Sequence, residues 1–140
     1  MTVLVTGSAG HLGEALVRRL QADGRDVRGL DIKPSPYTHV VGSIHDEGFV
    51  RDAMSGITQV IHSATLHKPH IATHTQRQFV DTNIAGTLTL LEAAVAHGVG
   101  AFVFTSTTSA FGAALSPAPG QPAAWIDEDV APVPKRIAGE

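Results

Sequence analysis

The 140-residue sequence contains no cysteine, which excludes a disulfide framework, thiol chemistry and thiolate metal sites. Charged residues make up only 16% of the chain and the formal net charge is −3, so electrostatics gives no reason to expect a nucleic-acid partner. No apolar run approaches the roughly eighteen residues of a membrane span, and the N-terminus lacks the basic and apolar regions of a secretion signal. We therefore expect a soluble, cytoplasmic protein without a membrane or nucleic-acid partner.

Aromatic residues are also scarce, since the chain has one tryptophan and one tyrosine, Tyr37. Hydrophobic residues nonetheless make up 43% of the sequence. This is enough for one core of ordinary size.

Three glycines spaced three residues apart, Gly7, Gly10 and Gly13, follow an apolar run and precede a helical pattern. This arrangement is typical of a turn that binds dinucleotide phosphates, because glycine permits a tight turn, close approach of the backbone to pyrophosphate and close helix packing. The helix then directs free N–H groups toward the phosphates. A strand–helix turn without a ligand can show the same triplet, so the triplet alone is weak evidence.

Asp31 ends the next apolar run and supplies the second part of this pattern. A carboxylate about twenty residues after the glycines accepts hydrogen bonds from the adenosine ribose hydroxyls. It also repels a 2′-phosphate, which favours NAD over NADP, although Lys33 and Arg28 are near enough in sequence to weaken that preference. The alternative is that Asp31 only forms a turn before the prolines that follow.

Strand and helix patterns alternate along the chain. We expect strands at residues 2–6, 27–31, 38–42, 59–62 and 101–105, and helices after Gly10, at 46–54 and at 75–96. Strands separated by helices imply right-handed crossovers, so the predicted fold is an α/β Rossmann-like parallel sheet in the order 3-2-1-4-5. On the long helix, several apolar residues fall near one face: Phe79, Ile84, Leu88, Leu91 and Val95.

The character of the sequence changes after Gly112. Residues 113–140 carry five of the eight prolines and show no clear period, which indicates an extended segment. We expect an NAD-binding Rossmann domain over residues 1–112 and a Pro/Ala-rich tail or loop over residues 113–140.

Four segments together resemble the extended short-chain dehydrogenase/reductase family, in its NAD-dependent epimerase/dehydratase group. They are the glycine turn at residues 6–13, Val60-Ile61-His62-Ser63-Ala64, Asn83-Ile84-Ala85-Gly86-Thr87 and the serine-rich residues 104–112. Their order and separations are similar to those of the family's N-terminal, cofactor-binding part. The resemblance implies a chain truncated before the catalytic helix and the substrate domain.

The resemblance also implies roles for single residues. The turn would hold the pyrophosphate, residues 31 and 32 the adenosine ribose, and residues 43 and 44 the adenine, where Ser43 replaces the family's usual aspartate. Asn83 would secure the long helix. Thr107 would contact a substrate hydroxyl or carbonyl, assisted by Ser109. The implied cofactor-binding residues are Gly7, Gly10, His11, Leu12, Gly13, Asp31, Ile32, Ser43, Ile44, Ser63, Ala64, Thr65, His67, Thr82 and Thr105.

The family's chemistry uses a tyrosine as acid or base and a lysine four residues later that lowers its pKa. Four residues after Tyr37 comes Val41. In the window where the family carries the pair, we expect Ala138 to stand in place of the tyrosine, and the lysine is absent. The resemblance therefore implies a domain that is inactive alone, with a sugar-nucleotide-like or other small substrate only if the site is completed.

Two alternatives remain open. The chain is a non-catalytic dinucleotide-binding or redox-sensing module, or it is an active oxidoreductase or epimerase with a substitute acid or base. For the latter the candidates are His67, His70 and His74, since histidine titrates near neutral pH. Zinc would need three or four donors on a firm scaffold, so we expect no metal in this proline-containing loop, which should border the nicotinamide or the substrate.

Two expectations concern packing. His62, at the end of a strand, is expected to be a hydrogen-bonded core histidine. Without the family's following helix, Phe102 and Phe104 would leave an apolar patch and an unpaired sheet edge, which favours association. We expect a homo-oligomer, or docking of the residue 113–140 tail over that face.

Overall fold

The structure, a computed structural model, describes residues 1–133. It divides into two compact units, Met1–Thr105 and Ser106–Glu140. This division falls before Gly112, where the sequence predicts that the Rossmann domain ends. The domain boundary at residue 112 stays a prediction. Within residues 1–133, no helix has the length and apolar character needed to cross a membrane.

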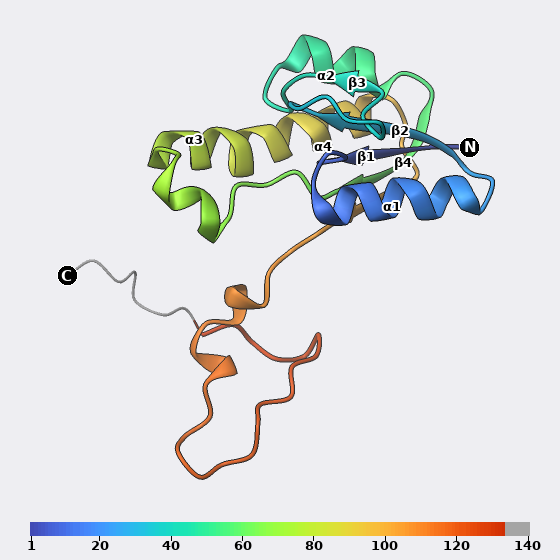
Figure 1. The fold of residues 1–140 in the computed structure, drawn as a ribbon. Coiled ribbons are helices and arrows are strands. Elements are labelled where there is room, and N and C mark those ends of the chain that lie inside the picture. Colours follow the sequence, from blue (N-terminus) through green and yellow to red (C-terminus); the bar gives the residue numbers. More distant parts are fainter. Residues whose placement is uncertain (134–140) are drawn as a thin grey trace. The chain divides into compact units, whose positions relative to one another are not determined.

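The first unit is built on a parallel sheet of five strands (Figure 1). The strands are β1 (Thr2–Thr6), β2 (Asp26–Asp31), β3 (Val40–Val41), β4 (Ile57–His62) and β5 (Ala101–Phe104). Their order is β3-β2-β1-β4-β5, and each neighbouring pair is parallel. The predicted Rossmann-like α/β fold and strand order are confirmed.

Helices cover both faces of this sheet. Figure 1 shows α1 (His11–Ala22) on one face and α2 (Glu47–Met54) with α4 (Gly86–Ala96) on the other. Asp46 caps α2, because its side chain accepts a hydrogen bond of 3.0 Å from the backbone N–H of Phe49. Such a cap satisfies one of the N–H groups that a helix start leaves without a partner.

The long helix predicted over residues 75–96 forms with one irregularity. It begins as α3 (Gln76–Val80), passes through a π-helical turn, η2 (Asp81–Ala85), and continues as α4. The residues at both junctions have right-handed helical backbone angles, so the chain stays helical throughout. Single π-turns inside α-helices often occur at functional sites.

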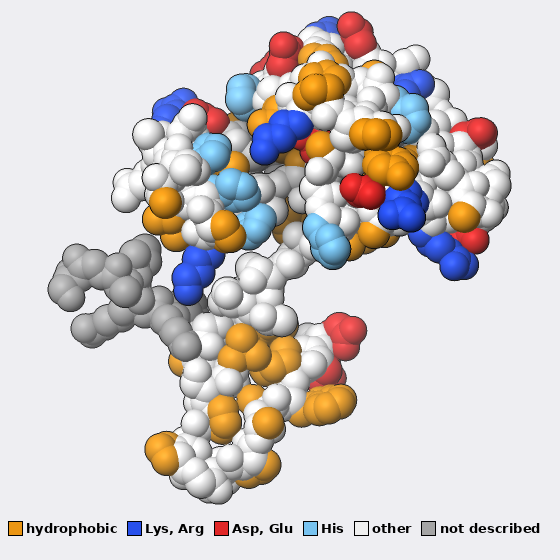
Figure 2. Space-filling view, in the orientation of Figure 1, with side chains coloured by type: hydrophobic (Ala, Val, Ile, Leu, Met, Phe, Trp, Pro, Cys, Tyr) orange, Lys and Arg blue, Asp and Glu red, His pale blue; other side chains and the backbone are white. Residues whose placement is uncertain are grey.

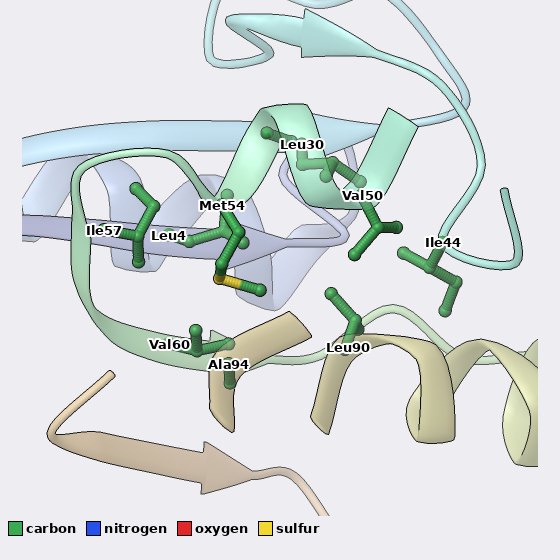
Figure 3. Close-up of a cluster of buried hydrophobic side chains, with 10 residues drawn as sticks. Leu4, Leu30, Ile44, Val50, Met54, Ile57, Val60, Leu90 and Ala94 are labelled. Carbon is green, nitrogen blue, oxygen red and sulfur yellow. The ribbon is translucent and has the colours of Figure 1, made fainter. Parts of the chain in front are cut away.

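The core follows from the two-residue period of the strands, which sends alternate side chains to opposite faces. Leu4 points to the face covered by α2 and α4, where it packs with Leu30, Met54 and Leu90 (Figure 3). Its neighbours Val3 and Val5 pack on the other face with Val17 of α1. These aliphatic clusters hold helices and sheet in register, and thereby fix the loops at the strand ends.

The long helix packs by a different face from the one that its apolar spacing suggested. Gly86, Leu90 and Ala94 are its buried residues, whereas Leu88 is 54% and Val95 83% exposed. The Leu, Val and Ala residues of α4 are spread around the whole helix, so periodicity could not show which face meets the sheet.

The second unit has little regular structure in its described residues, 106–133. It contains two short 3₁₀ helices, η3 (Thr108–Phe111) and η4 (Ala113–Leu115). Backbone hydrogen bonds join Ala113 N–H to the Val133 carbonyl (2.7 Å) and Val133 N–H to the Phe111 carbonyl (3.1 Å). Residues 116–132 contain turns but no helix or strand.

Candidate functional site

A cleft of about 780 Å³ opens in the first unit where the carboxyl ends of the strands meet. Thr6 of β1 lies opposite both Leu30 of β2 and His62 of β4, so the segments that follow these strands are neighbours. This edge is where ligands bind in open parallel sheets. Fourteen of the fifteen residues expected to bind the cofactor line the cleft: Gly7, Gly10, His11, Leu12, Gly13, Asp31, Ile32, Ser43, Ile44, Ser63, Ala64, Thr65, His67 and Thr82.

The glycine turn forms one wall of this cleft. Gly7 has a φ of +76°, a conformation that side chains disfavour. A Cβ at Gly13 would overlap the carbonyl oxygen of Gly7, so helix α1 packs on the turn only because residue 13 has no side chain. Gly10, the N-cap of α1, provides no side-chain cap, which leaves N–H groups at the helix start for an anionic ligand.

Asp31 lies at the end of β2 and lines the same cleft. Its Oδ2 accepts a hydrogen bond of 3.0 Å from the backbone N–H of Ala9, and its Oδ1 accepts one of 2.9 Å from that of Lys33. Each carboxylate oxygen has lone pairs for a further donor. The carboxylate therefore holds the glycine turn and can still accept hydrogen bonds from a ligand.

The two cations expected to weaken the preference for NAD lie in different places. Lys33 lines the cleft. Arg28 instead donates from Nη1 to the carbonyls of Ala53 (2.7 Å) and Ser55 (2.8 Å) at the end of α2. The expectation for Arg28 was wrong, because its guanidinium satisfies carbonyls that the helix end leaves without partners.

Ser43 and Ile44 enter the cleft between β3 and α2. Ile44 is only 4% exposed and belongs to the core, so the sheet and α4 hold this segment firmly. Ser43 Oγ lies 3.0 Å from Nδ1 of His45, which also lines the cleft. His45 was not predicted from the sequence, although its spacing of two residues from Ser43 in a short loop brings both side chains to one side.

The segment after β4, residues 63–66, forms the opposite wall and is attached to the π-turn η2. Asn83 Oδ1 accepts hydrogen bonds from Leu66 N–H (2.8 Å) and the Thr65 hydroxyl (3.0 Å), and Asn83 Nδ2 donates to the Leu66 carbonyl (2.8 Å). The side chain therefore joins the long helix to the cleft wall, as expected for Asn83. Leu66 itself lines the cleft and was not predicted.

His62 lies behind this wall and is 1% exposed. Nδ1 is 2.7 Å from the Thr6 hydroxyl, and Nε2 is 3.0 Å from the Thr87 hydroxyl. Burial lowers the pKa of His62 from 6.5 to about 4, because desolvation disfavours the charged ring. The expectation of a hydrogen-bonded core histidine is confirmed.

Three histidines, His67, His70 and His74, line the cleft on the side of α3. Their rings contact edge to face, with centroids 4.6 Å apart for the first pair and 5.3 Å for the second. Figure 2 shows histidine side chains, in pale blue, gathered on the face of the first unit that carries α3. No group of acidic or histidine side chains in residues 1–133 has a geometry that could hold a metal ion.

Other cleft residues come from the start of the long helix. Gln78 and Asp81 line the cleft beside Thr82, and Asp81 forms an ion pair of 2.8 Å with Arg77. These residues were missed, but Gln78 lies one helical turn before Thr82, and this i, i+4 spacing could have indicated it.

The remaining predicted positions lie elsewhere. Thr105 is absent from the cleft lining, and its N–H donates to the His62 carbonyl at 3.0 Å. Thr107 lies in the second unit, where its side chain caps η3 by accepting a hydrogen bond of 3.2 Å from Ser109 N–H. The substrate contact of Thr107 stays a prediction. Ala138, expected in place of the catalytic tyrosine, lies outside the described residues.

Similar proteins identify the family. A relative from Sinorhizobium fredii, described as an uncharacterized protein, is 35% identical over 82% of this chain and 30% of its own length. A dTDP-glucose 4,6-dehydratase from Streptomyces antibioticus is 35% identical over 80% of this chain and 39% of its own length. The chain thus spans well under half the length of these relatives.

Solved structures agree with this assignment. A short-chain dehydrogenase/reductase superfamily protein from Agrobacterium tumefaciens with bound NAD has a TM-score of 0.80 and 34% identity, covering 96% of this chain and 40% of that protein. UDP-glucose 4-epimerase from Thermus thermophilus in complex with NAD has a TM-score of 0.78 and 30% identity, covering 96% of this chain and 45% of that protein. The family described as NAD dependent epimerase/dehydratase matches residues 3–134. The chain belongs to the NAD-dependent epimerase/dehydratase family of the short-chain dehydrogenase/reductase superfamily.

Proposed function

We propose that this chain binds NAD(H) in the cleft of its first unit, as the dinucleotide-binding domain of an epimerase/dehydratase-type oxidoreductase. The observation that carries the proposal is the hydrogen bond between Ala9 and Asp31, which holds the glycine turn and the Asp31 carboxylate in one cleft. The pyrophosphate would lie against the free N–H groups at the start of α1. The adenosine ribose would bind Asp31.

The residues on the cleft wall fit a dinucleotide. NAD supplies the chemistry when bound, by accepting or returning a hydride, and the protein's part is to bind and orient it. Residues 43 and 44 lie beyond Asp31 and would meet the adenine. Residues 63–65 and Thr82 lie on the other side of the turn and would meet the nicotinamide ribose.

We propose NAD rather than NADP as the cofactor. Asp31 places a negative charge where a 2′-phosphate would have to bind. Lys33 lines the cleft nearby and is the one of the two cations that stays beside the proposed ribose site. With Arg28 bound to carbonyls of α2, less positive charge opposes the discrimination than the sequence suggested.

We propose that the chain alone does not turn over a substrate. Tyr37 is the single tyrosine of the sequence, and it packs against the cluster of Val3, Val5 and Val17 on the α1 side of the sheet. It is absent from the cleft lining. A substrate, sugar-nucleotide-like or another small molecule, would then need residues from outside this chain.

An active enzyme with a substitute acid or base is the second candidate. It is favoured by His70, which lines the cleft and accepts a hydrogen bond of 3.0 Å at Nδ1 from the His67 backbone N–H. In a neutral ring this leaves the hydrogen on Nε2. A ring in this state presents Nε2–H as a hydrogen-bond donor.

Calorimetric titration with NAD, NADH and NADP tests the binding, and an assay of hydride transfer with the same preparation tests turnover. We expect binding of NAD and NADH, weaker binding of NADP, and no turnover. Absence of dinucleotide binding would refute the proposed function. Turnover that disappears in His70→Gln would favour the second candidate.

Association of copies is a further part of the proposal. Of the two phenylalanines expected to form an apolar patch, Phe104 is 53% exposed, whereas Phe102 packs against the core cluster. Val103 is 56% exposed, and β5 lies at an edge of the sheet with one strand neighbour. Apolar area next to an unpaired edge favours association. Sedimentation equilibrium should show a homo-oligomer, and a stable monomer would contradict this part of the proposal.

We also propose a cytoplasmic location for the protein.

A further inference from the structure

Behind the cleft wall, three side chains and one backbone carbonyl from different parts of the fold form one chain of hydrogen bonds. The side chains are Thr6 of β1, His62 of β4 and Thr87 of α4, and the carbonyl belongs to Asn83 of η2. Thr6 and His62 are buried, and no buried side-chain nitrogen or oxygen in the described residues lacks a partner. The chain of bonds is therefore complete within the protein.

One set of hydrogen-bond directions satisfies every donor. The Thr87 hydroxyl donates to the backbone carbonyl of Asn83 at 2.9 Å, which leaves its oxygen as an acceptor for His62 Nε2 at 3.0 Å. Because Nε2 then carries the hydrogen, Nδ1 of the neutral ring is an acceptor and receives the Thr6 hydroxyl hydrogen. The oxygen of Thr6 in turn accepts from the N–H groups of Ser63 and Ala64, both at 3.2 Å.

Both ends of this chain of bonds reach the same segment. At one end, Thr6 holds the N–H groups of Ser63 and Ala64. At the other end, Asn83 holds both backbone groups of Leu66 through its side chain. His62 stands between them, and residues 63–66 all line the cleft.

We propose that His62, neutral with its hydrogen on Nε2, is a positioning residue that fixes residues 63–66 for the bound dinucleotide. The inference rests on the proposed function. It also concerns Thr65, which lines the cleft: its hydroxyl hydrogen is directed to Asn83 Oδ1 (3.0 Å) and the Leu66 carbonyl (3.3 Å), so toward a ligand this oxygen is an acceptor. Thr65 would accept a hydrogen bond from a ribose hydroxyl or amide of the ligand.

A packing role for His62 is the competing explanation, since its ring contacts Phe102 and Phe104 with centroids 6.1 and 5.5 Å away. Thr87→Val separates the two, because valine keeps the shape of threonine but offers no acceptor to Nε2. Thr87→Ser restores the hydroxyl. Phe102→Leu removes a ring contact and no hydrogen bond, so it is the packing control.

The measurements are NAD affinity by calorimetry, at a temperature where each variant is folded, and hydrogen exchange of the Ser63, Ala64 and Leu66 amides. We expect Thr87→Val to lower the affinity about tenfold and to speed the exchange of these amides, because it leaves a buried donor unsatisfied. Thr87→Ser should recover most of the affinity. Phe102→Leu should lower the Tm with unchanged affinity.

Nitrogen-15 NMR of the His62 ring in the unmodified chain gives a test that needs no variant. It should show a neutral ring with the hydrogen on Nε2 at pH 7, and a hydrogen on Nδ1 would overturn the proposal. Unchanged NAD affinity in folded Thr87→Val would also overturn it. If the unmodified chain binds no dinucleotide, the proposed function fails, while the ring tautomer and the amide exchange still decide whether His62 positions residues 63–66.

Discussion

The backbone N–H of Ala9 donates a hydrogen bond of 3.0 Å to Oδ2 of Asp31, although the two residues lie on different strand–helix connections. This bond ties the glycine turn after β1 to the end of β2. The other oxygen, Oδ1, accepts from Lys33 N–H at 2.9 Å. The carboxylate thus organises the phosphate-binding turn in addition to the ribose contact that we propose for it.

Replacing Asp31 should weaken NAD binding and reduce the discrimination against NADP. Asp31→Ala removes a charge-assisted acceptor, worth about 1.5–3 kcal/mol, and also releases the glycine turn. We expect NAD affinity to fall by about tenfold to a hundredfold and NADP affinity to fall less, as measured by calorimetric titration.

Asp31→Asn provides the matched control, because it keeps one acceptor oxygen and the side-chain volume but removes the charge. It should change the NAD-to-NADP ratio with less damage to the turn than alanine causes. An unchanged ratio in both variants would show that Asp31 does not set the cofactor preference.

Gly13→Ala should destabilise the fold and weaken dinucleotide binding. Its Cβ would overlap the Gly7 carbonyl oxygen, so either α1 or the turn must move. Overpacking of this kind costs about 1–3 kcal/mol. Urea unfolding and calorimetric titration measure the two effects.

Gly48→Ala in α2 is the control, since a Cβ there would come no closer than 3.5 Å to Asp46 Oδ1, an ordinary contact. Alanine is the better helix former by up to about 1 kcal/mol, so this variant should be neutral or slightly more stable. Equal losses in the two variants would contradict the packing role of Gly13.

The free energy of unfolding should decrease as the pH is lowered, because of His62. Its pKa is lowered to about 4 in the fold, against 6.5 for an unperturbed histidine, so the folded state favours the neutral ring. The stabilisation of the fold by the neutral His62 ring is complete above pH 6.5 and is lost as the pH falls from 6.5 toward 4. Its size is up to about 3 kcal/mol.

An NMR titration of the histidine rings tests this directly. The His62 resonances should stay in the neutral position at pH 6.5, where an unperturbed histidine is half protonated. A transition of His62 near pH 6.5 would contradict the burial argument.

The two faces of α4 should respond differently to the same substitution. Leu90 is fully buried, whereas Leu88 is 54% exposed. Leu90→Ala should cost about 2–5 kcal/mol, and Leu88→Ala should change the free energy of unfolding by less than about 0.5 kcal/mol. Chemical denaturation of the two variants checks the face assignment, and a larger loss at Leu88 would reverse it.

The strand order and the cleft were predictable because their signals are local. The continuous apolar run of Val3, Leu4 and Val5 identifies a strand with two covered faces, and the position of Asp31 at the end of the next strand brings it to the edge that carries the glycine turn. Parallel connectivity then leaves few arrangements of the sheet. Most residues of the proposed binding site follow from these signals and from the family resemblance.

The contacts of Arg28 and the buried face of α4 depend on distances between segments that are far apart in the sequence. Arg28 has the same local sequence whether it faces the cleft or the end of α2, and only the packing of α2 brings carbonyl oxygens to its guanidinium. The buried face of α4 was equally undetermined, because a helix with apolar residues on all sides has no unique periodic stripe.

The sequence by itself determined the glycine turn, the acidic residue after β2 and the alternation of strands and helices, since backbone freedom and side-chain period act over a few neighbouring residues. Only the tertiary structure decided that Leu90 rather than Leu88 is buried, and that the Thr87 hydroxyl lies 3.0 Å from Nε2 of His62, 25 positions earlier. Such contacts arise when separate elements pack against each other. No local pattern encodes the distance between them.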